Sequence, residues 1–211
     1  MPTLYIHPLS TPALSTAFMA SALDAGIETK IVNLMEGEQM GEDYKKINPM
    51  GKVPALDDEG FCLSESAAIM RYLAKSRQSD LYPENIQAQA QVDQWLDYVG
   101  YHVRTPFSRI QFNTMFAEML GQEKDEKSIE FGRHILSTSL PHIDAQLKAN
   151  SYLCGEAMSI ADLSLLATLD PADHLEVDLT PYPHLKAWRD ARRSEPFYKH
   201  VHNHYGEEIG L

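Results

Sequence analysis

Residues 48–66 have the sequence NPMGKVPALDDEGFCLSES, in which two short apolar runs flank a turn. The runs are residues 53–56 and 61–63, and the Asp-Asp-Glu-Gly between them is typical of a β-hairpin turn. A helical pattern then begins at Ser66 and continues to about Ala74. This stretch predicts two adjacent strands followed directly by a helix.

The residues before this hairpin alternate between strand and helix patterns. We predict a strand at residues 3–7, a helix at 13–25 closed by Gly26, a strand at 29–33 and a weak helical turn at 42–47. With the hairpin and its helix, the predicted order is β-α-β-α-β-β-α. This order indicates one mixed sheet with helices on its faces, the α/β part of the chain.

The sequence after residue 78 changes to helical patterns. Residues 79–85 are polar and aperiodic and contain Pro83, so they are the predicted linker between domain 1–78 and an all-helical domain, 86–211. Ser159 to Asp162 has capping-box spacing and predicts the start of a buried helix. The other predicted helices are 86–120 (bent or broken at Gly100 and Pro106), 127–149, 183–193 and 195–204.

Composition excludes several classes of protein. The 211 residues are 44% hydrophobic and carry a net charge of −12, which disfavours nucleic acid and anionic membranes as partners. Cys62 and Cys154 show no metal or redox spacing. No run is long enough to span a bilayer, and Pro8 and Pro12 interrupt the uncharged start, so we expect a cytoplasmic protein. An anionic small ligand would need local positive potential from a cation or a helix N-terminus.

Three short segments carry side chains suited to ligand chemistry. Pro12 suits the first helical position, so Thr11 is the expected N-cap and Ser10 lies just outside the helix, either as a loop hydroxyl or as a catalytic group. Val53, held extended before Pro54, is either a residue of a plain edge strand or one that offers its N–H and C=O to a peptide-like ligand beside Lys52. Glu65 and Ser66 are either a simple helix cap or a clamp for a zwitterion, with the carboxylate on an ammonium group.

Together these segments resemble the glutathione transferase superfamily over essentially the whole chain. Val53-Pro54 resembles its cis-proline loop, Glu65-Ser66 its γ-glutamyl clamp, and Ser159 to Asp162 its capping box. The resemblance implies a thioredoxin-like N-terminal domain, glutathione as co-substrate, no metal, a cytoplasmic homodimer and a role in detoxification. The implied glutathione contacts are Thr11, Lys52, Val53, Pro54, Glu65 and Ser66.

Ser10 is the catalytic residue that the resemblance implies, because serine-type members, similar to the theta and delta classes, place a Ser two residues after a Pro at the end of the first strand. Thr11, at the position of the bacterial cysteine, and Tyr5, within the first strand, are the alternatives. Two departures predict weak glutathione affinity: Ala13-Leu14 stand where many relatives carry an Arg, and Gly51 stands where they often have a polar contact.

The helical domain is expected to bind the electrophile near Pro106. The candidate contacts are Tyr98, Tyr101, His102, Arg104 and Phe107, and core or dimer packing is the alternative for about half of them. Glutathione conjugation of small, mostly apolar electrophiles is the expected reaction. Another glutathione-dependent enzyme, an isomerase or a dehalogenase, and a non-catalytic interaction module on the same fold remain as alternatives.

Overall fold

The computed structural model describes residues 1–23 and 26–209, with only the backbone described for 206–209. Contacts divide the chain into two compact units, Met1–Pro83 with Arg193–Leu211 and Glu84–Arg192. The last helix of the chain therefore groups with the N-terminal sheet. The predicted end of the first helix at Ala25 lies outside the described residues.

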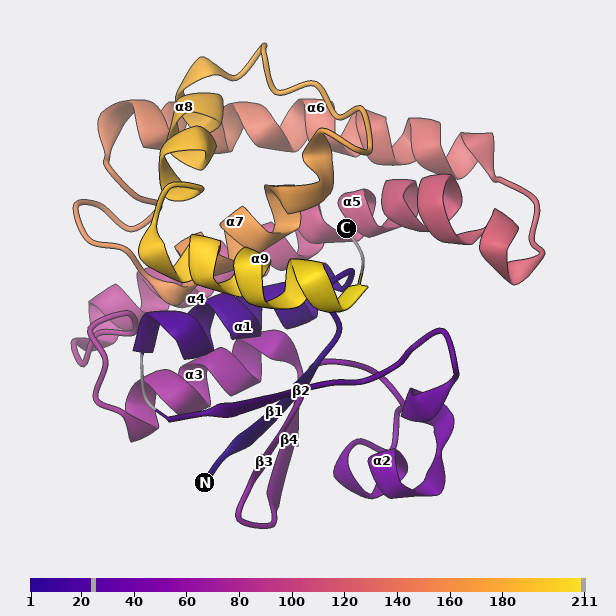
Figure 1. The fold of residues 1–211 in the computed structure, drawn as a ribbon. Coiled ribbons are helices and arrows are strands. Elements are labelled where there is room, and N and C mark those ends of the chain that lie inside the picture. Colours follow the sequence, from indigo (N-terminus) through magenta and orange to yellow (C-terminus); the bar gives the residue numbers. More distant parts are fainter. Residues whose placement is uncertain (24–25, 210–211) are drawn as a thin grey trace. The chain divides into compact units, whose positions relative to one another are not determined.

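The first unit is built on a four-stranded mixed sheet (Figure 1). Its strands are β1 (Thr3–Ile6), β2 (Glu28–Ile31), β3 (Ala55–Asp58) and β4 (Phe61–Ser64), in the order β2-β1-β3-β4. Strand β1 pairs parallel with β2 and antiparallel with β3, and β3 pairs antiparallel with β4. This arrangement confirms the predicted thioredoxin-like domain.

Helices cover both faces of this sheet. On one face, the buried side chains of Leu4 and Ile6 lie under α1 (Thr11–Leu23) and α3 (Ser66–Ser76). On the other face, Tyr5 packs with Val32, Ala55 and Tyr44, which belongs to α2 (Glu42–Ile47). The helical turn predicted at residues 42–47 is thus confirmed.

Helix α9 (Pro196–Ile209) packs along α1, as Figure 1 shows. The ring of Phe18 is fully buried, with centroids 5.6 Å from Phe197 and 5.3 Å from Tyr198. Because β1, α3 and α9 all contact α1, this helix is apolar around most of its circumference instead of on one stripe.

Three predicted boundaries were wrong by a few residues, each for a local reason. Helix α1 begins at Thr11 instead of Ala13, because the carbonyl of Ser10 already accepts the N–H of Leu14 at 2.8 Å. Strand β3 begins at Ala55 because Pro54 has no N–H to give to a ladder. Strand β2 ends at Ile31, and the N–H of Asn33 is taken by the carboxylate of Glu38 at 2.6 Å.

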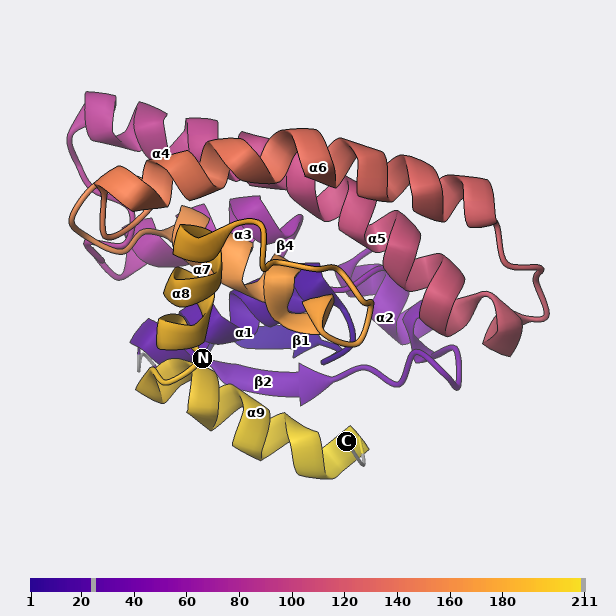
Figure 2. The same ribbon diagram turned by 90° about the horizontal axis from the view of Figure 1, so that it is seen from above.

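The second unit consists of helices, confirming the predicted all-helical domain. They are α4 (Ile86–Tyr98), α5 (Thr105–Gln111), α6 (Glu126–Ala149), α7 (Ile160–Leu169) and α8 (Pro183–Arg192), with short segments η2 (Val99–Arg104), η3 (Phe112–Phe116), η4 (Glu118–Leu120) and η5 (Asp170–Ala172). Helices α5 and α6 lie side by side (Figure 2). No helix among the described residues has the length and apolar character needed to cross a membrane.

The predicted break at Gly100 and Pro106 is instead a wide helical segment. Residues of η2 form π-helix between α4 and α5, and both the N–H and the Oγ1 of Thr105 bond to the Gly100 carbonyl. Pro106 lies in the first turn of α5, directly after this π-helical segment, where the wider turn accommodates a residue with no N–H for the helical ladder. The chain therefore stays helical through both residues.

Asp162 anchors α7, whose ten residues are all buried. Its carboxylate accepts the N–H of Ser159 at 2.8 Å and the N–H of Leu153 at 2.9 Å. The predicted capping box is confirmed, and it also holds the loop that precedes the helix.

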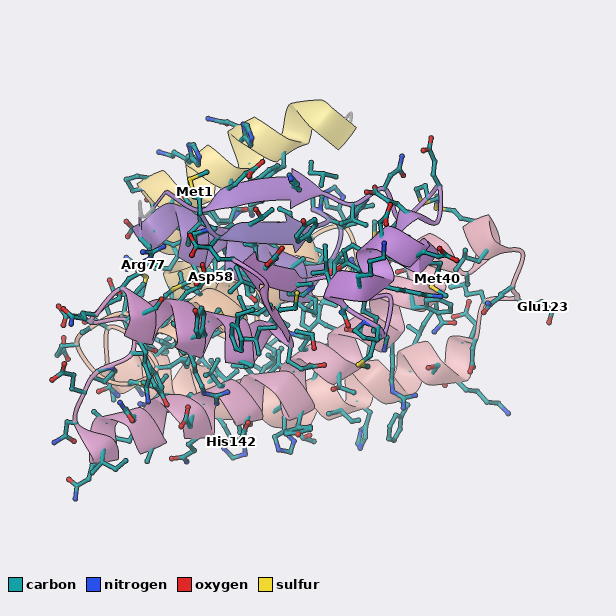
Figure 3. All side chains as sticks on the ribbon, turned by 90° about the horizontal axis from the view of Figure 1, so that it is seen from below. Met1, Met40, Asp58, Arg77, Glu123 and His142 are labelled. Carbon is teal, nitrogen blue, oxygen red and sulfur yellow. The ribbon has the colours of Figure 1, made fainter. Side chains whose placement is uncertain are left out.

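Gly51 brings the loop before β3 against η1 (Glu38–Met40). Its φ is +61°, and a Cβ placed there would lie 2.9 Å from the Gln39 carbonyl oxygen and 2.9 Å from the sulfur of Met40, which Figure 3 labels. This close approach accounts for a glycine at the position where related sequences were expected to have a polar contact.

We predict that Asp162→Ala lowers the free energy of unfolding by about 3–5 kcal/mol, because two buried N–H groups lose a charged acceptor. Asp178, which is exposed, also accepts two bonds, from the N and Oγ1 of Thr180, and serves as the control. Asp178→Ala is expected to cost less than about 1 kcal/mol. Urea unfolding followed by circular dichroism measures both, and equal losses would contradict the anchoring role.

Gly51→Ala is predicted to destabilise the protein more than Gly26→Ala. Both glycines have φ of +61°, but none of the residues that the structure describes lies within 4 Å of a Cβ at Gly26. The left-handed backbone costs each alanine about 1 kcal/mol, and the clash at Gly51 adds about 1–3 kcal/mol. Thermal unfolding of the two variants compares them directly, and indistinguishable melting temperatures would rule out the close approach.

Candidate functional site

Ser10 lies in the turn that joins β1 to α1. Its N–H donates to the carbonyl of His7 at 2.9 Å, and its Oγ accepts the N–H of Ala13 at 3.4 Å. Ser10 is therefore the N-cap of α1, where Thr11 was expected. Since the oxygen accepts in this bond, the hydroxyl keeps its own O–H to donate to a ligand.

The two alternatives to Ser10 are less well placed, Thr11 by its burial and Tyr5 by its position on the sheet. The side chain of Thr11 opens α1 and is only 4% exposed. Tyr5 projects from the face of the sheet opposite Leu4 and Ile6, and its ring packs edge-on against Tyr44 with centroids 5.9 Å apart. The half-buried Ser10 is the better-placed hydroxyl at the start of the helix.

The loop before β3 is held by two side chains that the sequence analysis missed. The carbonyl of Lys52 accepts the hydroxyl of Tyr44 and the Nδ2 of Asn48, both at 2.7 Å. Burial, with smaller contributions from Tyr5 and Glu38, raises the pKa of Tyr44, so this hydroxyl remains a donor. The sequence marked the Asn-Pro pair at residues 48–49 as the end of a helical turn, but it gave no sign that Asn48 bonds to the carbonyl of Lys52.

Val53 follows this pinned carbonyl, and the Val53–Pro54 peptide bond is cis, as the resemblance implied. Pro54 is buried and Val53 is half-buried, while the Lys52 side chain is exposed. Within the described part of the chain, no partner is found for the backbone N–H or C=O of Val53. These two groups are therefore available to an extended ligand, as in strand addition.

Glu65 and Ser66 form the turn into α3. Glu65 has φ of +68° and ψ of 114°, a strained conformation for a residue with a Cβ, and its carbonyl accepts the N–H of Ile69 at 2.9 Å. The Glu65 side chain is exposed, while Ser66 is 5% exposed at the first helical position. The turn therefore directs a carboxylate to solvent beside a helix start, where the first N–H groups point out of the helix toward the positive end of its dipole.

Sheet register brings these three segments together. Tyr5 pairs with Ala55, and Ala55 pairs with Ser64, so β1 and β4 end where β3 begins. At this end of the sheet, Ser10 comes shortly after β1, Val53 shortly before β3 and Glu65 directly after β4. The three residues therefore lie at the same end of the sheet. Asp58, labelled in Figure 3, belongs to the hairpin at the opposite end.

This end of the sheet also supplies positive potential to a strongly acidic chain. Helices α1 and α3 both begin here, each with the positive end of its dipole toward the site. Lys52 adds a cationic side chain on the intervening loop. The arrangement meets the requirement that composition set for an anionic ligand.

The helical unit distributes its five candidate residues between core and surface. Phe107 is 1% exposed and is a core residue, not a ligand contact, and the hydroxyl of Tyr98 is bonded to the carbonyl of Ser139 at 2.9 Å. Tyr101 is 72% exposed, and the ring of the exposed His102 lies tilted at 45° to that of Tyr98, with centroids 5.0 Å apart.

Arg104 alone of this set lines a hollow of about 460 Å³ in the helical unit. Its Nε donates to the Oγ1 of Thr168 at 3.3 Å, and its Nη2 donates to the Oγ of Ser164. The hollow is lined by Gly100, Arg104, Thr105, Ser108, Arg109, Phe112, Asn113 and Ser128.

The described residues contain no group of three or more His, Cys, Asp or Glu side chains able to hold a metal. His202, which lies in α9, packs its ring on that of Tyr198, with the ring centroids 3.9 Å apart. Cys62 and Cys154 are free cysteines, and burial raises the pKa of Cys154 to about 11, far from a reactive thiolate.

Comparison with known proteins agrees with this geometry. Residues 2–75 match the glutathione S-transferase N-terminal domain, and residues 95–196 match its C-terminal domain. Glutathione S-transferase F10 of Arabidopsis thaliana is 35% identical over 205 residues, covering 92% of this chain and 94% of that protein.

Two solved structures show the same similarity in three dimensions. A delta-class glutathione transferase of Nilaparvata lugens aligns with a TM-score of 0.86 at 30% identity, over 100% of this chain and 97% of its own. Glutathione S-transferase I from maize, in complex with an atrazine glutathione conjugate, aligns with a TM-score of 0.87 at 27% identity, over 97% of each chain. From its sheet, its cis-proline loop and these matches over nearly its whole length, this chain belongs to the glutathione S-transferase family.

Proposed function

We propose that this protein conjugates the glutathione thiolate to small, mostly apolar electrophiles, with Ser10 as the residue that activates the thiol. The observation that carries the proposal is the common position of Ser10, Val53 and Glu65-Ser66 at one end of the sheet. These three segments offer the groups that a tripeptide thiol needs: a hydroxyl for sulfur, a strand edge for the peptide and a clamp for the γ-glutamyl end.

Glutathione is proposed to bind as an added extended segment. The N–H and C=O of Val53 pair with the cysteinyl backbone, with Pro54 beneath it and Lys52 supplying positive charge. The carboxylate of Glu65 receives the γ-glutamyl ammonium, and the Ser66 hydroxyl and the N–H groups at the start of α3 receive its carboxylate. Thr11 contributes through the first turn of α1.

Thiol activation then follows from a hydrogen bond and a dipole. A free thiol has a pKa of about 8.5, and a hydrogen bond to a charged acceptor is worth about 1.5–3 kcal/mol, or roughly one to two pKa units. The N-terminus of α1 adds about 0.3–1 kcal/mol in the same direction. Ser10 itself stays protonated and donates to the thiolate, and the thiol proton passes to solvent, because a lowered thiol pKa populates the thiolate at neutral pH.

The electrophile is proposed to meet the helical unit near Arg104, with Tyr98, Tyr101 and His102 contributing aromatic surface. The guanidinium of Arg104 suits a carboxylate or a developing negative charge. The conjugate in the maize relative supports an aromatic electrophile as the substrate class. A cytoplasmic homodimer is part of this proposal.

A titration of thiolate ultraviolet absorbance tests the proposed function first. We expect the pKa of glutathione at saturating protein to lie at least one unit below that of glutathione in buffer, because Ser10 and the α1 N-terminus favour the charged sulfur. The same titration without protein is the control. An unshifted pKa, or no binding, would leave a non-catalytic interaction module as the better description.

Ser10→Ala is predicted to lower turnover at neutral pH at least about tenfold while leaving glutathione affinity within about twofold, since one pKa unit of thiol activation is lost. Ser10→Asp is the sharper variant. It keeps an N-cap for α1 but places a negative charge beside the sulfur, so it separates capping from activation and should be slower still. Steady-state kinetics with an aryl halide measures both, and Thr11→Val tests the alternative hydroxyl. Normal turnover in Ser10→Ala together with a loss in Thr11→Val would transfer the role to Thr11.

A further inference from the structure

His7 holds the turn that carries Ser10 through two separate hydrogen bonds. Its ring Nδ1 accepts the N–H of Leu9 at 3.2 Å, and its backbone carbonyl accepts the N–H of Ser10 at 2.9 Å. The side chain is 6% exposed. Because Pro8 has no N–H, the first two backbone donors after His7 both bond back to this one residue.

We propose that His7 is a positioning residue for Ser10, acting through the acceptor at Nδ1. The proposal rests on the proposed function, since it assigns a role in placing the hydroxyl that activates glutathione. The bond from a side-chain acceptor to the N–H two residues later is the turn normally made by Asp or Asn. Here a buried imidazole makes it, directly before the start of α1.

The chemistry of this acceptor matters beside a thiolate. An Asp at residue 7 would make the same turn but would add a negative charge near the anion that the site must stabilise. A neutral imidazole accepts the bond without that charge. Burial lowers the pKa of His7, which favours the neutral ring, and the acceptor role of Nδ1 assigns the ring proton to Nε2.

Small displacements of Ser10 are sufficient to affect the reaction. Its Oγ already accepts the Ala13 N–H at 3.4 Å, so the hydroxyl direction depends on how the turn enters α1. A shift of about 1 Å in a catalytic group costs up to about a hundredfold in rate. His7 is expected to restrict that shift through the Leu9 N–H.

A pair of His7 substitutions tests the acceptor atom directly. Asn places its Oδ1 where Nδ1 lies, while Gln places its polar atoms farther out, where Nε2 lies. We expect His7→Asn to keep the thiol pKa of bound glutathione and kcat within about twofold, and His7→Gln to lower kcat about fivefold to tenfold with an unchanged glutathione Kd. A global structural role would instead lower glutathione affinity in both variants.

The double variant Ser10→Ala/His7→Gln shows whether His7 acts through Ser10. We expect it to be no slower than Ser10→Ala alone, because His7 acts only by positioning the Ser10 hydroxyl, which the double variant already lacks. A further loss in the double variant overturns the positioning role. Wild-type kcat in His7→Gln, or equal losses in His7→Asn and His7→Gln, overturns it too.

Two readouts separate this proposal from the proposed function and from a folding failure. An unshifted thiol pKa in the wild-type protein overturns the proposed function and this assignment together, whereas a shifted pKa with normal His7→Gln overturns this assignment alone. If His7→Gln does not fold, ¹⁵N spectra of the wild-type histidine rings decide. A His7 protonated only at Nε2 at pH 7.5 supports the acceptor role, and a protonated Nδ1 overturns it.

Discussion

The pairing register of three strands determines where the candidate site forms. Ala55 is paired on one side with Tyr5 and on the other with Ser64, so one residue aligns the ends of three segments distant in sequence. A slip of one residue would send Leu4 and Ile6 to the wrong face of the sheet, so burial of these side chains fixes the register. The hydrophobic core and the placement of Ser10, Val53 and Glu65 thus depend on the same constraint.

Electrostatics at this end of the sheet oppose those of the chain as a whole. The net charge of −12 repels anions, but at physiological salt this repulsion is largely screened beyond about 10 Å. Near the sheet, the starts of α1 and α3 act over a few ångströms with little screening. Binding of an anionic ligand therefore depends on the nearby N–H groups at these helix starts. The net charge of the chain does not attract such a ligand.

Sequence patterns predicted the elements of this fold better than the contacts between them. The β-α-β-α-β-β-α order, α2, α6 and the capping box at Ser159 follow from local spacing, and the structure confirms them. The bonds from Tyr44 and Asn48 to the Lys52 carbonyl depend on how α2 packs, which no local pattern records. Phe107 lies in the core, which was one of the two alternatives left open for it, since an aromatic residue near a proline has the same appearance in a core as at a surface.

The position of α9 affects how this protein is made. The ring of Phe18, near the start of the chain, is covered by Phe197 and Tyr198, which lie near its end. Synthesis proceeds from the N-terminus, so α1 leaves the ribosome long before the side chains that cover it. Until α9 emerges, the ring of Phe18 on the nascent sheet domain stays uncovered, and such transiently exposed apolar surface is what chaperones bind.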